Sequence, residues 1–460
     1  MTESEAARLE QVPLRVTHPQ RVPSKRYYDQ EFFELEREKL WPHVWQLAAR
    51  LEEIPDVGDY VEYTNLAKSV IVVRTKSGVK AFHNACRHRG VQLVIEPGNC
   101  KSTGFICPFH GWRWNMDGDN TFVYGRRIFD EVNLEAAELN LVPCRVELWG
   151  GCAFINHDDD APSLLESLGP VAERMDARNV ENLRMEGWWA IELPTNWKLA
   201  MEAFMEGYHV MRTHPQLYQS LTTDKIGYFG ADAGGKLLPE ASNEEYLGKT
   251  VDQLGKLSRG MAGMVLPGEI AIAERLLKEE WPDDIATVGK QFYRRIKEEI
   301  YAEGQAQGLP VPDLNDFDEK YPYNPVEYFF PHYFLLPYFA GMSGYRIRPL
   351  TPETCLFELW SLAFLPDDAP RLTEPVVLPH TSPDIPEIPR QDYSNLPRQQ
   401  LGLHAGGFEY MRLSHQMEGQ IGNYQRLIDG FLAQLDKKKL AKAQNAVNVG
   451  FNSPVADIGF

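Results

Sequence analysis

The pattern of hydrophobic and polar positions changes character several times along the chain. Residues 28–50 combine aromatic and charged side chains with the spacing of an amphipathic helix. From residue 57 the pattern becomes an alternation rich in valine, with the turn KSG between two runs, which predicts β-hairpins. Strand-like segments continue to VELWGGCAFINHD at 146–158. We therefore expect a helical N-terminal part over 1–39 and a small, mostly β domain over 40–158.

The remaining residues, 159–460, predict a larger mixed domain. A helix is expected over 162–176, and the stretch 186–215 runs from a strand into a helix. Charged helical stretches fill residues 216–330, which form an unusually long insertion. Strands are expected over 326–365 and a helix over 417–440. Strands followed by helices are typical of an α+β fold around an antiparallel sheet, so the N-terminal part is expected to complete this domain.

Composition narrows the class of protein. The chain has 65 acidic and 47 basic residues and a formal net charge of −18, which argues against a nucleic-acid partner. No apolar stretch reaches the ~18 residues that a membrane span needs. The N-terminus lacks a basic segment followed by an apolar run, so no secretory leader is expected. Six cysteines in 460 residues fit a reducing compartment, and we expect a cytoplasmic protein.

Two short loops in the β domain carry soft metal ligands. CRHRG at 86–90 and CPFHGW at 107–112 each supply one cysteine and one histidine, namely Cys86, His88, Cys107 and His110. Such a set can bind zinc or a [2Fe–2S] cluster. Zinc fingers usually pair like ligands within one loop, whereas mixed loops suit two inequivalent irons. The pattern favours a cluster with both cysteines on one iron and both histidines on the other.

A second group of metal ligands is expected in EAFMEGYHVMRTHP, residues 202–215. Two imidazoles, here His209 and His214, with one carboxylate form the facial arrangement of non-haem Fe(II) oxygenases. A spacing of five does not place them on one face of a regular helix, so either a distortion or a helix ending near Thr213 and Pro215 is expected to bring them together. The spacing does not choose the carboxylate, because Asp392 and Glu418 are both candidates. Glu202 is either a surface charge or a residue that supports the ligands.

These motifs resemble those of Rieske ring-hydroxylating oxygenase α subunits. CRHRG and CPFHGW resemble the family's Rieske motif, and residues 202–215 with NWK at 196–198 resemble its iron-binding segment. The resemblance implies a [2Fe–2S] cluster on the four loop ligands and a mononuclear non-haem Fe(II) that uses O2. It also implies a helix-grip, START-like catalytic domain around a hydrophobic cavity.

The resemblance also assigns the acidic residues. The family's third iron ligand heads a helix with the pattern Asp, two residues, Asn, then Gln and Gly. That pattern is matched by Asp392, Asn395, Gln400 and Gly402, so Asp392 is preferred to Glu418. A carboxylate three residues before the first histidine links the iron to a neighbouring subunit's cluster in that family. Glu206 matches it here, where many members have aspartate.

The implied function is that of a terminal oxygenase α subunit. Its expected reaction is dihydroxylation or monooxygenation, including O-demethylation, of an aromatic or other hydrophobic substrate. Side chains near the ligands, such as Phe204, Met205 and Met211, are expected in the substrate pocket. The chain has no G-x-G-x-x-G motif that opens a helix after a strand, so a separate ferredoxin or NAD(P)H-dependent reductase is expected to supply electrons. The family's assembly implies an α3 or α3β3 complex.

Two other classes of protein remain open at this point. One is a Rieske electron-transfer or redox-sensing protein in which only the [2Fe–2S] site is loaded. The other is a zinc-stabilised interaction protein, which would be colourless. The number and kind of bound metals separates these classes from an oxygenase.

Overall fold

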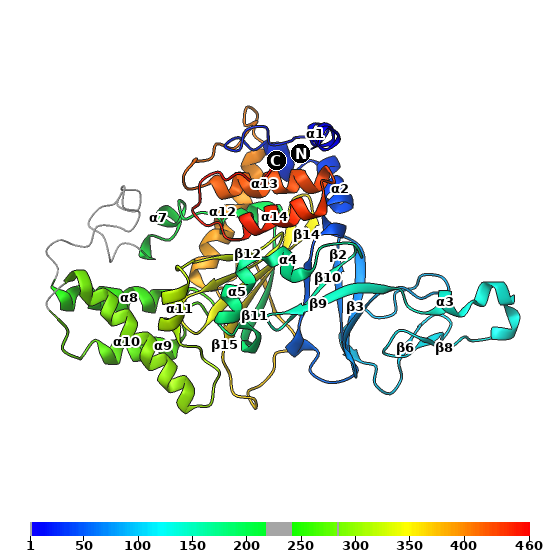
Figure 1. The fold of residues 1–460 in the computed structure, drawn as a ribbon, viewed down its shortest axis with the longest axis horizontal. Helices are drawn as coiled ribbons and strands as arrows, with labels where there is room; N and C mark the ends of the chain where they lie inside the picture. The colour runs from blue at the N-terminus through cyan, green and yellow to red at the C-terminus, as the bar shows by residue number, and fades with distance from the viewer. Residues whose placement is uncertain (1, 218–241, 283–284) are drawn as a thin grey trace. The chain divides into compact units, whose positions relative to one another are not determined.

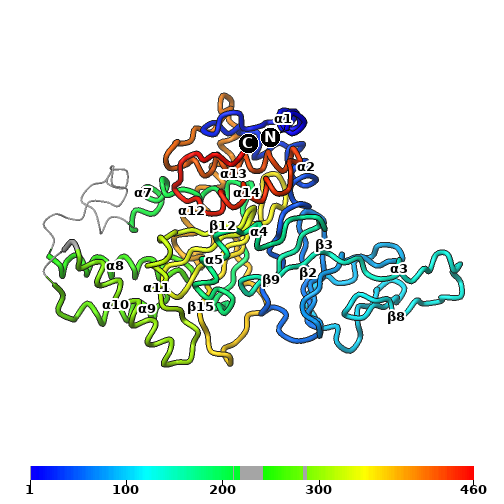
Figure 2. Tube along the Cα trace, viewed as in Figure 1, coloured from blue at the N-terminus to red at the C-terminus, as the bar shows by residue number. Residues whose placement is uncertain are grey.

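The chain folds into two compact units. The computed structural model describes residues 2–217, 242–282 and 285–460 (Figures 1 and 2). The smaller unit spans Glu36–Ser167, and the larger one combines Met1–Leu35 with Leu168–Phe460. Within the described ranges, no helix combines the length and apolar character needed to cross a lipid bilayer.

The smaller unit is built from two antiparallel sheets, as the alternating sequence pattern predicts. A seven-stranded sheet has the order β1-β10-β9-β4-β3-β2-β5, and a three-stranded sheet has the order β6-β7-β8. The predicted turn is present, because Thr75 pairs with Gly78 around a two-residue loop. The strands are β1 (Gln46–Arg50), β2 (Asp59–Asn65), β3 (Lys68–Thr75), β4 (Gly78–His83), β5 (Gly98–Asn99), β6 (Phe105–Ile106), β7 (Arg113–Trp114), β8 (Asn120–Phe122), β9 (Pro143–Trp149) and β10 (Cys152–Asn156).

The expected helix over 28–50 is wrong in its last third. Helix α2 covers Gln30–Lys39, and residues Gln46–Arg50 form strand β1 instead. All five residues of β1 are buried, so the strand shows no alternation of polar and apolar positions. Its pairing with β10, which is also buried throughout, determines its conformation.

The seven-stranded sheet of the smaller unit buries different cores on its two faces. One core contains Ile71, Val73 and Phe82 with the cysteines of both ligand loops. The other contains Val70, Val72 and Ala81 with Cys144. Because successive strand residues point to opposite faces, the alternation along β3 and β4 divides the two cores. The ligand loops therefore belong to one face of this sheet.

The larger unit is organised around a six-stranded sheet with the order β12-β13-β14-β15-β11-β16. All neighbours are antiparallel except β11 and β16, which are parallel. The predicted α+β class with an antiparallel sheet is confirmed, with β16 as a parallel edge. The strands are β11 (Arg184–Leu193), β12 (Glu327–Phe329), β13 (Tyr333–Pro337), β14 (Met342–Thr351), β15 (Thr354–Ala363) and β16 (Val376–Pro379).

Helices of the larger unit come from both ends of its chain and pack together. The N-terminal segment, drawn in blue, lies beside the orange and red C-terminal helices (Figure 2). Helix α6 packs on β14 and β15, and α12 packs on α6. The helices are α1 (Glu3–Glu10), α5 (Pro170–Ala177), α6 (Trp197–Glu202), α7 (Val210–Thr213), α8 (Asn243–Gly260), α9 (Pro267–Leu276), α10 (Ile285–Ala306), α11 (Leu314–Lys320), α12 (Glu387–Leu403), α13 (Gly419–Leu432) and α14 (Lys437–Asn448).

Two short helices lie elsewhere. Helix α3 (Ala136–Leu139) belongs to the smaller unit, and α4 (Leu164–Leu168) lies where the chain passes from one unit to the other.

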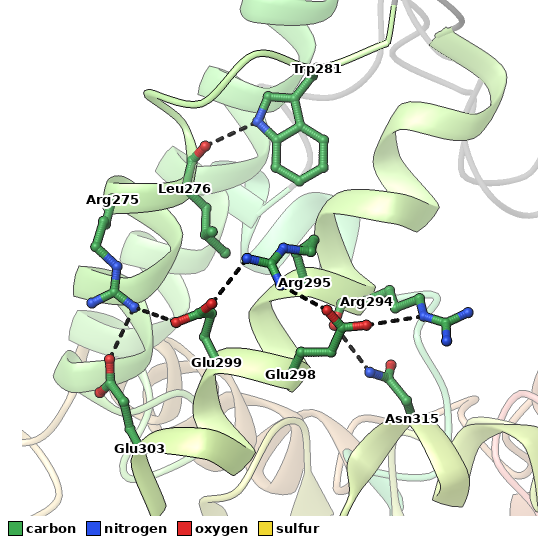
Figure 3. Close-up of polar contacts among 9 residues, drawn as sticks. All are labelled: Arg275, Leu276, Trp281, Arg294, Arg295, Glu298, Glu299, Glu303 and Asn315. Carbon is green, nitrogen blue, oxygen red and sulfur yellow. Dashed lines mark hydrogen bonds and ion pairs between the residues drawn. The ribbon is translucent and has the colours of Figure 1, made fainter. Parts of the chain in front are cut away.

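Charged helices form the described part of the 216–330 region, in agreement with the sequence pattern. Helices α8, α9 and α10 contact one another. Their surface carries an ion-pair network in which Arg275 of α9 reaches Glu299 and Glu303 of α10 at 2.9 and 3.0 Å (Figure 3). Exposed pairs of this kind contribute about 0–1 kcal/mol. Buried apolar side chains such as Leu276 and Phe292 therefore supply most of the helix packing.

Candidate iron centres

His209 and His214 lie at the two ends of a single helical turn. Helix α7 covers Val210–Thr213, with His209 as its N-cap and His214 as its C-cap. The helix therefore ends at Thr213, which is one of the two possibilities that the five-residue spacing left open. The imidazole centroids are 5.4 Å apart and the rings are nearly perpendicular, with an interplanar angle of 79°. Ending the helix lets both rings point to one place, which a continuous helix would prevent.

Asp392 of α12 completes this group. Its Oδ1 atom lies 3.0 Å from Nε2 of His214 and 3.7 Å from Nε2 of His209. One donor atom from each of the three residues lies within 4.8 Å of the others. Helix α12 begins at Glu387, so Asp392 lies in its second turn and does not head the helix as the sequence pattern suggests. Prolines are tolerated in a first helical turn, so the helix starts inside the Pro-rich segment at 378–390.

Glu418, the other acidic candidate, lies outside this ligand group. Its carboxylate accepts a hydrogen bond from the backbone N–H of Ser414 at 2.7 Å, and it precedes helix α13 as the N-cap residue. It lines a cavity of about 620 Å³ that Glu206 and Asp392 also reach. Burial raises the pKa of Glu418, and the neighbouring charge of Glu206 adds to that effect.

Each histidine of the pair is oriented through its Nδ1 atom. Nδ1 of His209 donates to Oε1 of Glu206 at 2.8 Å, and the His209 backbone N–H donates to Oε2 at 3.0 Å. Nδ1 of His214 donates to Oε1 of Gln391 at 2.6 Å. Both Nε2 atoms are thereby left as acceptors on the side of Asp392, which is the arrangement that a divalent iron requires.

Gln391 is a functional candidate that the sequence pattern missed. Its Oε1 atom also accepts from Nε2 of Gln216 at 2.9 Å, so its amide is held from two directions. The only signal in the sequence is its place directly before Asp392. A glutamine beside a proposed ligand has no diagnostic spacing, so the tertiary structure was needed to find it.

Glu206 controls the protonation of His209. Burial by itself would lower the pKa of this imidazole. The hydrogen bond and negative charge of Glu206, together with the charge of Asp392, outweigh burial and raise the pKa. Glu206 lies in an irregular segment between α6 and α7, so its contact with His209 does not depend on a helical i, i+3 spacing.

Glu202 is not a surface charge, which excludes one of the two sequence interpretations. It is 4% exposed, accepts from the hydroxyl of Tyr27 at 3.0 Å and also accepts from Gln425. Burial raises the pKa of Glu202 to about 7, against the lowering effect of these hydrogen bonds. Its side chain lines the same 620 Å³ cavity as His209.

A second, mostly apolar cavity of about 320 Å³ is lined in part by His209, His214 and Asp392. Of the three side chains expected there, Phe204 lines the cavity and Met205 does not. The side chain of Met211 lies outside what the structure describes. Other apolar lining residues come from α8 and the segment after it, from β13 and from α12. They include Leu257, Met261, Met264, Leu336 and Ile388.

The two Rieske-type loops of the smaller unit share one backbone pattern. In the first, the N–H groups of Cys86 and Gly90 donate to Val91 and Cys86 at 2.8 and 2.9 Å. In the second, Cys107 and Gly111 donate to Trp112 and Cys107 at 2.9 and 3.0 Å. Gly90 and Gly111 have φ values of +76° and +71°. Both loops therefore need glycine where the chain turns back.

The loop side chains converge as the motif predicts. The rings of His88 and His110 are 4.6 Å apart, and the indole of Trp112 stacks on His88 at 4.9 Å. Cys86 and Cys107 are 4% and 1% exposed. Burial, followed by the adjacent Cys107 thiol, raises the pKa of Cys86.

One atom of the loops tests the fit of a [2Fe–2S] cluster. Nδ1 of His88 is buried and has no hydrogen-bond partner among the described residues. A bound iron would satisfy it, and the four donors are the Cys2His2 set of a Rieske centre. The residues present therefore fit such a cluster.

Two segments of the chain match models of known protein families. Residues 180–434 match the family model of the ring hydroxylating alpha subunit (catalytic domain), and residues 44–123 match that of the Rieske [2Fe-2S] domain. These domains imply a Rieske cluster, a mononuclear non-haem iron and O2.

Among curated relatives, the carnitine monooxygenase oxygenase subunit of Escherichia coli (strain K12) is 32% identical over 207 residues, which is 44% of this chain and 54% of that protein. The 2-aminobenzenesulfonate 2,3-dioxygenase subunit alpha of Alcaligenes sp is 33% identical over 203 residues, 43% of this chain and 50% of that protein. The chain thus spans about half the length of the curated relatives it matches.

A solved structure agrees in fold. Naphthalene 1,2-dioxygenase from Rhodococcus sp., bound to indole, is 20% identical, covers 94% of this chain and 98% of its own, and superposes with a TM-score of 0.58. The catalytic family model spans more than half of the chain, so this protein belongs to the family of ring-hydroxylating oxygenase α subunits with a Rieske [2Fe–2S] domain.

Proposed function

We propose that this chain is the terminal oxygenase subunit of a Rieske non-haem iron system that hydroxylates a hydrophobic substrate with O2. The observation that carries the proposal is the convergence of His209, His214 and Asp392 beside a mostly apolar cavity. In this proposal residues 40–158 act as the Rieske domain, and residues 1–39 with 159–460 act as the catalytic domain.

The proposed metal ligands fall into two sets. Cys86, His88, Cys107 and His110 hold the [2Fe–2S] cluster, and His209, His214 and Asp392 hold the mononuclear iron. When bound, these groups supply single electrons and the activation of O2. The two sets lie in different units of the chain.

The side chains around the iron ligands orient them and control their protons. Glu206 and Gln391 hold the Nδ1–H tautomers of the two histidines, so Nε2 of each ring is available. Three protein ligands leave coordination positions for O2. Glu206 is also the proposed link to a cluster-bearing neighbour subunit, because it precedes the first histidine by three residues as in the family.

The cavity beside the ligands favours a small hydrophobic substrate. Its volume of about 320 Å³ is at the lower end of ligand sites, which are roughly 300–1,000 Å³. Among its described lining residues there is no lysine or arginine to pair with a substrate anion. An uncharged aromatic compound of one or two rings fits this description.

Partners and location follow the family's mode of action. We propose electrons from a separate ferredoxin or NAD(P)H-dependent reductase, an α3 or α3β3 assembly, and a cytoplasmic location. None of the six cysteines, all of which lie in described residues, forms a disulfide, which supports a reducing compartment.

The decisive experiment combines metal analysis with labelled O2. The purified chain, with a surrogate reductase, is given one- and two-ring aromatic compounds under ¹⁸O2. We expect about three irons per chain and labelled product, with one ¹⁸O atom for monooxygenation and two for dihydroxylation. A loaded protein that holds only the two cluster irons and forms no labelled product would instead be an electron carrier.

A further inference from the structure

A second group of metal-binding side chains lies in the smaller unit, apart from the Rieske loops. It consists of His83, Cys144 and His157, and one donor atom from each lies within 4.8 Å of the others. Cys144 is 4% exposed, while both histidines are half-buried. The thiol is therefore inside the fold, and the two imidazoles beside it are partly exposed to solvent.

Strand register brings the three side chains to one face of the sheet. Cys144 of β9 pairs with Ala81 of β4, and His83 lies two residues after Ala81 on the same side. On the other neighbour, β10, Asn156 pairs with Arg145, so His157 follows opposite Cys144. Strands β4 and β9 thus each supply one ligand, and the third is the residue that follows β10.

The contacts within the cluster match a metal site in size. Nδ1 of His157 lies 3.8 Å from Sγ of Cys144, and the His83 and His157 rings stack with centroids 5.4 Å apart. Around a tetrahedral zinc, bonds of ~2.3 Å to sulfur and ~2.0 Å to nitrogen separate these atoms by about 3.5 Å. Among the described residues, the imidazole of His157 has one hydrogen-bond contact, with Sγ of Cys144, and the imidazole of His83 has none.

The cluster is independent of the [2Fe–2S] ligands. Cys144 and Ala81 belong to one core of the seven-stranded sheet, whereas Cys86 and Cys107 belong to the core on its other face. A metal bound at Cys144 would therefore be separated from the cluster by the sheet itself.

We propose that His83, Cys144 and His157 bind a zinc ion that joins strands β4, β9 and β10. One thiolate and two neutral imidazoles are ligands that suit Zn²⁺. The fourth position is open to water, and the charge of Asp159 acts electrostatically on both Cys144 and His83. Lys68 opposes the ion, but it is exposed and its charge is screened by solvent.

Zinc alone is the probe for this site. All proteins carry Asp392→Ala, which keeps zinc out of the His209–His214 group, and all hold a loaded cluster as judged by its visible spectrum. After dialysis against Zn²⁺, we expect one zinc per chain by elemental analysis. X-ray absorption at the zinc edge should show one sulfur at ~2.3 Å and two imidazole nitrogens at ~2.0 Å.

The number of sulfur ligands separates the possible sites. Zinc in the Rieske loops would show two sulfurs, and zinc at remaining histidines and carboxylates would show none. Either result, or no bound zinc, overturns the proposal.

Variants give an independent test. Cys144→Ser should lose the zinc and keep the visible spectrum of the cluster. Cys100→Ala is the matched control, because Cys100 is a buried thiol of the same unit with 2% exposure, and it should keep the zinc. If Cys144→Ser does not fold, His157→Gln at a half-buried position should lose the zinc instead. Zinc retained in a folded Cys144→Ser or His157→Gln protein contradicts the assignment.

Discussion

The two proposed histidine ligands of the mononuclear iron differ in what holds them. His209 donates to the carboxylate of Glu206, whereas His214 donates to the neutral amide oxygen of Gln391. A carboxylate partner raises the basicity of an imidazole more than an amide does. The two ligands are therefore inequivalent before any metal binds.

Gln391 is expected to position His214. Gln391→Leu removes the acceptor of Nδ1–H, so the iron affinity should fall roughly 10- to 100-fold, while Gln391→Glu should retain iron. The measurement is iron retention against a graded chelator. Gln399→Leu, at an exposed position of the same helix, is the control. Equal iron affinity in Gln391→Leu and Gln399→Leu would show that His214 needs no such support.

The pH dependence of iron binding should depend on Glu206. Because Glu206 raises the pKa of His209, protons compete with iron at a higher pH than they would at an imidazole without this partner. Glu206→Gln removes the charge, lowers this pKa and should move the fall in iron affinity to lower pH. Iron affinity is measured against pH and normalised to the plateau at high pH. Glu418→Gln, which makes no contact with His209, should leave the midpoint unchanged.

Glu202 should make stability depend on pH near neutrality. Its pKa is about 7 in the folded chain against 4.5 for an ordinary glutamate. A raised folded pKa contributes stability that is present below pH 4.5 and is lost as the pH rises through about 7.

Glu202→Gln cannot titrate and tests this expectation. Relative to wild type, its stability should improve on going from pH 5 to pH 8 by an amount on the order of 3 kcal/mol. The Tm of both proteins at the two pH values is the measurement. Parallel Tm changes would mean that Glu202 is ionised throughout this range.

At the scale of elements, the helices and the strands of the larger unit have different roles. The one-turn helix α7 has one of the two histidines at each end. Helix α12, which is distant in sequence, places Gln391 and Asp392 beside them. The paired strands β14 and β15, of ten residues each, form the part of the sheet on which helix α6 packs.

A buried ion pair joins β14 and β15. Arg346 and Glu358 face each other across the strands, and two hydrogen bonds of 2.7 Å connect them. Although burial opposes ionisation, the positive charges of Arg346 and Arg348 lower the pKa of Glu358 to about 2. The carboxylate is therefore charged inside the fold.

Removing one partner of this pair should destabilise the unit. Arg346→Met leaves Glu358 with Arg348 alone, and the free energy of unfolding should fall by about 3 kcal/mol. Denaturant unfolding measures this loss. The double variant with Glu358→Leu should recover part of it, because the buried carboxylate is removed and Arg348, which also pairs with Glu358, is only partly buried. A double variant less stable than Arg346→Met would contradict this account.

At the scale of the whole molecule, the number of irons per chain reports the ligand assignment. Asp392→Ala should lose the mononuclear iron and retain the visible spectrum of the cluster, so iron falls from about three to about two per chain. Glu418→Ala should keep all three, because Glu418 lies outside the ligand group. His209→Ala should likewise spare the cluster and abolish oxygenation. Loss of iron in Glu418→Ala but not in Asp392→Ala would reverse the choice of ligand.

Much of this molecule follows from local sequence. The alternation from residue 57 and the turn KSG predicted the hairpins, and the ligand spacing in CRHRG and CPFHGW predicted the two matched loops. The five-residue gap between His209 and His214 indicated either a distortion or a helix end near Thr213 and Pro215, and the helix ends at Thr213. These features are local, because hydrogen bonds and side-chain direction within a few residues determine them.

Other features were decided by tertiary structure. Strand β1 lacks an alternating pattern because both of its faces are buried, and only its pairing with β10 makes it a strand. Gln391, the burial of Glu202 and the cluster of His83, Cys144 and His157 all depend on contacts between distant segments. By itself the sequence determined which chemical groups the chain carries and where its local turns fall. Packing decided which groups meet, since residues far apart in sequence come together only when their elements bury a common core.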